Sequence, residues 1–86
     1  LRDERLLTLT LKVGTPSESL IGQALKDIPL PEGTLIALVR RGPKVVIPRG
    51  ATVLERGDRL TIIGEPTDLG TLGKRFKAHA PSPGVA

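Results

Sequence analysis

Residues 48–66 read PRGATVLERGDRLTIIGEP and place an apolar run between two turns. Glycine tolerates the positive φ that tight turns need, and an aspartate beside it can accept hydrogen bonds from local backbone amides. We therefore predict that Gly50, Gly57 and Asp58 are structural turn residues. The turn at Gly57 and Asp58 then directs a strand over 59–63.

The segments before this stretch predict a strand, a helix and a hairpin. Residues 5–13 alternate apolar and polar side chains, which is typical of a half-buried antiparallel strand. Apolar residues at helical spacing predict a short helix from Ser17 or Ser19 to Ile28, which Pro29 ends. Residues 34–41 are apolar on both faces, which indicates a central strand or one covered by a second subunit. A turn at 42–43 and a return strand over 44–47 complete the hairpin.

The segment after it predicts a second helix. Pro66 suits the first turn of a helix, and Asp68 is favourable near its positive end. The predicted buried stripe of this helix consists of Leu69, Leu72 and Phe76. The element order is β-α-β-β-β-α, so we expect an α+β domain with a small mixed or antiparallel sheet and two helices.

The length and composition predict one domain that associates with a second copy. A domain of 86 residues buries only about 60% of its unfolded surface. The core must come from aliphatic residues, because the chain holds one Phe and no Trp, Tyr or Met. We expect a homodimer for this reason. We assign 1–4 to a linker, 5–78 to the folded domain and 79–86 to a flexible tail, and a start at Leu1 indicates a piece of a longer protein.

The sequence lacks the residue sets that catalysis and metal binding need. Without cysteine, a disulfide framework and a cysteine metal site are excluded. His79 is the one histidine, and no serine has a base nearby in the predicted fold. No glycine-rich stretch follows a nucleotide-binding pattern. We therefore expect no enzyme activity, no metal, and no cofactor in this domain, and we find neither a signal peptide nor an apolar run of about 20 residues.

The positive charge gathers in two places and leaves two interpretations open. The net charge is +4, with one cluster in the predicted hairpin and one near the end of the second helix: Arg40, Arg41, Lys44 and Arg49, and then Lys74, Arg75 and Lys77. A small nucleic-acid-binding domain would use both clusters. Binders of single strands generally add aromatic platforms, and Phe76 is predicted to be core. Solvated arginines at strand ends are the plainer interpretation, and nucleic acid is an unlikely partner.

An ordered series of short motifs resembles the TrkA C-terminal, or RCK C-terminal, domain family over about residues 5–77. The motifs are Ser19-Leu-Ile-Gly22-Gln-Ala-Leu25, Leu30-Pro-x-Gly33, Ile36-x-x-Val39-Arg40-Arg41-Gly42, Val46-Ile47-Pro48, Gly50-x-Thr52-x-Leu54 and Gly57-Asp58-x-Leu60-x-x-x-Gly64. The resemblance implies the fold predicted above and a homodimer. It also implies a cytoplasmic regulatory module, held at the inner face of the membrane by the transport domain of its parent protein.

The resemblance further implies a ligand site in the dimer cleft. Some members of the family bind a small anionic effector such as the cyclic dinucleotide cyclic di-AMP there, using an apolar pair, an arginine and an asparagine. By position Leu35, Ile36 and Arg41 or Arg40 match the first two roles. Ile47 stands where the asparagine is expected, and the chain contains no asparagine. NAD, where the family uses it, binds a separate RCK N-terminal domain.

The expected function is thus ligand sensing and dimerisation in a cation transport or cation/proton antiport protein, with potassium as the expected ion. A module that dimerises without any ligand is the first alternative. The basic nucleic-acid-binding domain is the second.

Overall fold

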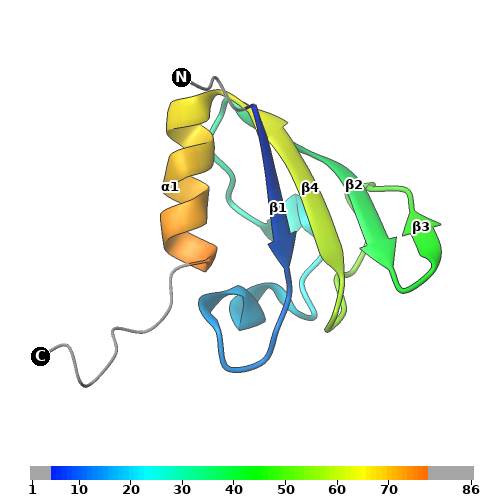
Figure 1. Ribbon diagram of the computed structural model, residues 1–86. Helices are drawn as coiled ribbons and strands as arrows, with labels where there is room; N and C mark the ends of the chain where they lie inside the picture. Colours follow the sequence, from blue (N-terminus) through cyan, green and yellow to red (C-terminus); the bar gives the residue numbers. More distant parts are fainter. Residues whose placement is uncertain (1–4, 78–86) are drawn as a thin grey trace, which may run out of the picture.

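The computed structural model describes residues 5–77, which form one antiparallel sheet and one α-helix (Figure 1). The strands are β1 (Leu6–Thr10), β2 (Thr34–Arg41), β3 (Lys44–Val46) and β4 (Arg59–Gly64), and the helix is α1 (Pro66–Phe76). Two 3₁₀ turns, η1 (Pro16–Leu20) and η2 (Leu25–Asp27), lie between β1 and β2. The strand order is β1-β4-β2-β3, so β4 and β2 are central.

The hairpin and the last helix agree with the sequence predictions. β2 and β3 pair antiparallel, and Gly42 begins their two-residue loop at φ +60°. A positive φ at the first loop residue matches the right-handed twist of the strands. Helix α1 begins at Pro66 and buries the predicted stripe of Leu69, Leu72 and Phe76.

The first predicted helix is wrong, because its segment turns back to pair with residues 52–54. Gly22 lies at φ +89°, outside the helical region, and its N–H donates a 2.8 Å hydrogen bond to the Leu54 carbonyl. Leu54 in turn donates to the Gln23 carbonyl, and Ala24 forms a β-bridge with Val53. The two short 3₁₀ turns on either side are what remains of the helical pattern.

Residues 34–41 are apolar on both faces, and a bulge decides which of them lie in the core. A β-bulge between Ile36 and Leu38 shifts the alternation, so that Ile36 and Val39 both face the core. Leu35 remains 60% exposed on the opposite face. The strand is central, as predicted, but only one of its faces is covered. β1 ends at Thr10, earlier than its predicted end at 13.

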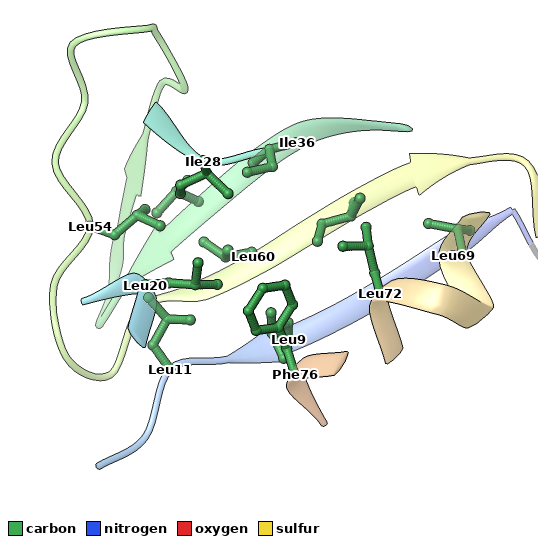
Figure 2. Close-up of a cluster of buried hydrophobic side chains, with 12 residues drawn as sticks. Leu9, Leu11, Leu20, Ile28, Ile36, Leu54, Leu60, Leu69, Leu72 and Phe76 are labelled. Carbon is green, nitrogen blue, oxygen red and sulfur yellow. The ribbon is translucent and has the colours of Figure 1, made fainter. Parts of the chain in front are cut away.

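The core fills the space between one face of the sheet, α1 and the 3₁₀ turns. α1 contacts β1, β4 and η1. Twelve aliphatic or aromatic side chains form a single buried cluster (Figure 2): Leu9, Leu11, Leu20, Ile28, Ile36, Val39, Leu54, Leu60, Ile62, Leu69, Leu72 and Phe76. The cluster draws on every strand except the short β3.

The other face of the sheet has no element packed on it among the described residues. Leu6, Ile63 and Leu35 are partners across β1, β4 and β2, so they form one apolar row. All three side chains are exposed. This face is called the outer face below.

Two glycines provide a matched test of the backbone at Gly22. We expect Gly22→Ala to lower the free energy of unfolding by about 1 kcal/mol or more, because alanine is strained at positive φ. Gly70→Ala, inside α1, should raise it by about 0.5–1 kcal/mol through helix propensity. A Cβ added at either position meets no atom within 4 Å, so packing does not confuse the comparison. Urea unfolding measures the change in the free energy of unfolding for both variants. Changes of the same sign and size would contradict the positive φ at Gly22.

Candidate functional site

Two dipeptides at facing strand ends place four charged residues together. Arg40-Arg41 ends β2, and Asp58 directly precedes Arg59, the first residue of β4. Arg40 is the register partner of Arg59. Side chains alternate between the faces of a sheet. Arg41 and Asp58 therefore lie on one side of the sheet, and Arg40 and Arg59 lie on the outer face.

The inner pair forms a bidentate ion pair. The Arg41 Nε donates to Asp58 Oδ1 at 2.9 Å, and its Nη2 donates to Oδ2 at 2.8 Å. The same Nη2 donates to the Val53 carbonyl at 3.0 Å, and Nη1 lies 3.1 Å from the Glu55 carboxylate. Asp58 is fully buried, and its Oδ2 also accepts the Glu55 backbone N–H at 2.9 Å.

Hydrogen bonding keeps Asp58 charged inside the protein. Burial by itself raises the pKa of this carboxyl, but hydrogen bonds from Arg41 and the Glu55 amide outweigh it, so the pKa lies below 3.8. The hydrogen bond to Asp58 is the main reason that the Arg41 pKa is raised. Removing one partner of such a pair leaves an uncompensated charge. Arg41 is thus committed to holding the 53–58 segment against β2.

The outer pair is left without a counter-charge. Arg40 and Arg59 are exposed, and neither forms an ion pair with another described residue. Like charges directly opposite on neighbouring strands destabilise a sheet, by roughly 0.2–1 kcal/mol per pair. The two arginines line an open hollow of about 250 Å³ with Gly42 and Gly57. A Cβ added at either glycine would meet no atom within 4 Å, so no side chain covers the guanidinium groups from there.

The residues that the resemblance assigned to one ligand cleft divide into separate groups. Leu35 and Ile36 line a hollow of about 230 Å³ beside Pro48 and Arg49, although Leu35 is exposed and Ile36 is buried. Arg40 and Arg41 do not line that hollow. Ile47 follows β3 and is exposed.

The predicted turn residues lie where the chain reverses. Gly57 is at φ +88°, and its N–H donates to the Leu11 carbonyl at 2.9 Å. Leu11 donates back to the Asp58 carbonyl, which ties this turn to the end of β1. The Gly50 carbonyl accepts the Lys26 N–H at 3.0 Å. Asp58 accepts a local backbone amide, as the sequence indicated.

Two contributors were missing from the sequence analysis. Arg59 stands opposite Arg40, and Ile63 stands between Leu6 and Leu35 on the outer face. The signal for Arg59 is the pair of dipeptides Arg40-Arg41 and Asp58-Arg59. If these lie opposite each other, the two arginines Arg40 and Arg59 share one face of the sheet. That inference needs the register between β2 and β4, and the bulge in β2 shifts this register.

No metal-binding cluster of three or more His, Cys, Asp or Glu side chains occurs within residues 5–77. His79 lies outside the described residues. The described part of the chain also holds no helix of the length and hydropathy that a membrane span requires.

The fold and the sequence define the same class of domain. A solved structure described as an RCK domain with cda matches 85% of this chain and 99% of its own, with a TM-score of 0.70 and 19% identity. That likeness supports the fold alone. The family model of the TrkA-C domain matches residues 10–77, and the chain belongs to this family.

Its relatives include parts of potassium transport proteins. The chain is 34% identical over 70 residues to a Trk system potassium uptake protein TrkA homolog of Archaeoglobus fulgidus, covering 81% of this chain and 16% of that protein. It is 41% identical over 56 residues to the K(+)/H(+) antiporter NhaP2 of Shewanella oneidensis, covering 65% of this chain and 10% of the antiporter. The chain therefore spans only a small share of the relatives' length.

The buried carboxylate makes stability depend on pH in a defined direction. Because the folded pKa of Asp58 is depressed, its contribution is present above the unfolded value near 3.8 and is lost as pH falls through the folded value. At pH 7 we expect Asp58→Asn to lower the free energy of unfolding by about 3 kcal/mol. The gap between variant and wild type should narrow as pH falls from 4 to 2.5.

Urea unfolding at pH steps from 7 to 2.5 measures this gap. The matched control is Asp27→Asn, since Asp27 is exposed and its effect should be small throughout. A gap for Asp58→Asn that stays constant over the whole range would contradict the charged, hydrogen-bonded state of this carboxyl.

Proposed function

We propose that this chain is a dimerising, ligand-sensing regulatory domain of a cation transport protein, with potassium as the ion. Membership of the TrkA-C family carries the proposal, together with relatives in potassium uptake and in K⁺/H⁺ antiport. In this proposal the domain is cytoplasmic and non-enzymatic, and a transport domain of the parent protein holds it at the inner face of the membrane. NAD would bind elsewhere in that parent.

The outer face is the proposed contact between two copies. Its apolar row of Leu6, Ile63 and Leu35 crosses three strands, and no described element shields it. Burying one such side chain contributes about 1.5–3 kcal/mol. A two-fold contact uses the same patch on both copies, so each residue of the row counts twice. A small aliphatic domain would thereby complete the core that its own length limits.

The proposed effector is a small anion, such as a cyclic dinucleotide, bound at the arginine end of the same face. Arg40 is the available arginine, because Arg41 is engaged by Asp58, Glu55 and the Val53 carbonyl. Leu35 supports an apolar part of the ligand at the same face. Ile47 offers no hydrogen bond where family members use an asparagine, so cyclic di-AMP would lose a contact there.

Regulation requires that the effector distinguish two arrangements of the dimer. A ligand shifts an equilibrium only by the difference between its affinities for the two states. An anion that touches arginines from both subunits meets this condition, because the distance between the subunits changes how many of them it reaches. The arrangement of the dimer would then pass to the attached transport domain. A dimer that no anion stabilises would correspond to the dimerisation module without a ligand.

Sedimentation velocity tests the dimer and its face. We expect the wild-type chain to sediment as a dimer at tens of micromolar. Leu35→Ser and Ile63→Ser should shift it toward monomer, because each removes apolar surface twice from a two-fold contact. Val13→Ser is the control, since Val13 is about as exposed as Leu35 but lies outside the strands of the sheet. A wild-type chain that stays monomeric and folded at high micromolar concentration rejects the proposal.

A further inference from the structure

The unneutralised Arg40 and Arg59 are held together by the ion pair on the other side of the same strands. Arg41 and Asp58 are the sequence neighbours of these two arginines, and their bidentate contact fixes the end of β2 against the start of β4. Because Arg41 and Asp58 are held together, Arg40 and Arg59 must also lie opposite each other on β2 and β4. The fold thus keeps two cations side by side that would otherwise repel each other.

The chemistry of this arrangement suits an anion. Two guanidinium groups present planar sets of donors that match the oxygens of a phosphate group. The hollow beside them is lined by Arg40, Gly42, Gly57 and Arg59, with no carboxylate among its lining residues. Both glycines are at positive φ, so the backbone turns away without a side chain over the opening.

We propose that Arg40 and Arg59 together form a phosphate-binding site at this end of the outer face, and that Arg59 is a ligand-binding residue of the domain. The site rests on the proposed function, because it supplies the charged part of the effector site and assigns the effector a phosphate group. Both arginines come from one subunit, so phosphate recognition needs no second copy. In the dimer the second copy of this pair would bind a further phosphate group of the same ligand, so the distance between the subunits still changes the affinity.

Arg59 also borders a second hollow, which lies at the β1 edge of the sheet. This hollow measures about 360 Å³, and besides Arg59 it is lined by apolar as well as polar residues: Thr8, Leu9, Thr10, Lys12, Thr15, Ser17, Phe76 and Lys77. Thr10 is the register partner of Arg59 on β1. Hydroxyls and ammonium groups on this side would bind further oxygens of a phosphorylated ligand. A pyrophosphate or a nucleotide therefore fits the surface better than a neutral molecule.

Thermal melting of the 86-residue chain with inorganic pyrophosphate, and separately with AMP, tests the site. Each variant removes one positive charge: Arg40→Gln, Arg59→Gln, and Lys74→Gln as the control, since Lys74 is exposed on α1 and lines neither hollow. We expect a saturable rise in melting temperature for wild type and for Lys74→Gln. The affinity should fall about tenfold in Arg40→Gln and in Arg59→Gln, as expected for one charge-assisted contact. If only pyrophosphate raises the melting temperature, the ligand is a free phosphate compound. If AMP raises it as well, the ligand is a nucleotide.

A second readout distinguishes a binding role from a structural one. Without ligand, Arg59→Gln should melt at the same temperature as wild type or higher, because it removes a like-charge opposition. A lower melting temperature would assign Arg59 to the fold. No stabilisation by either probe, an unchanged affinity in both variants, or tight binding of single-stranded DNA instead would overturn the site.

The failure of this inference and the failure of the proposed function are separable. Sedimentation velocity on the same samples reports the dimer, which Arg59→Gln should leave intact. A monomer that binds pyrophosphate through these arginines would keep the site and reject the dimer. A dimer that binds neither probe would reject the site alone.

Discussion

The ion pair between Arg41 and Asp58 is the interaction on which the rest of this structure depends. It joins the end of β2 to the turn that precedes β4, and it also draws in the Val53 carbonyl and Glu55. Asp58 is fully buried, so the pair must be complete for the turn to be stable. The backbone of the Gly57 and Asp58 turn also forms two hydrogen bonds with Leu11, the residue that directly follows β1. This contact therefore fixes the corner of the sheet where the ends of β1 and β2 meet the start of β4.

The outer face holds the residues to which we assign dimerisation and ligand binding. Its apolar row lies at one end and its opposed arginines lie at the other. An exposed apolar patch favours contact with another apolar surface. Two arginines with no ion-pair partner among the described residues favour an anion. The two ends suit a domain in which association and ligand binding are coupled. Membership of the TrkA-C family, with relatives in potassium transport, gives that coupling a context.

Much of the fold could be predicted from the sequence, because each strand and the last helix carry local signals. Alternation marks β1, the loop at Gly42 marks the hairpin, and Pro66 marks the start of α1. The first helix was predicted wrongly, since Gly22 adopts a positive φ and its neighbours pair with residues 52–54. That pairing joins segments about 30 positions apart in the chain, and local propensity contains no information about it.

The site was harder to predict, because one bulge decides which face each residue of β2 occupies. Simple alternation places Leu35, Val39 and Arg41 on one face, whereas the bulge places Ile36 with Val39 toward the core. The sequence could identify Arg40 and Arg41 as candidates but could not separate their roles. The structure engages one of them with Asp58 and leaves the other beside Arg59.

A double-mutant cycle on Arg41 and Asp58 tests the central claim most directly. Urea unfolding of Arg41→Ala, Asp58→Ala and the double variant gives the coupling free energy between the two side chains. We predict a coupling above about 1 kcal/mol, within the roughly 0.5–3 kcal/mol found for residues in contact, so that the double variant is less destabilised than the sum of the two single effects. Single effects that add to within about 0.5 kcal/mol would show that the pair does not hold the strands together, and would contradict this account.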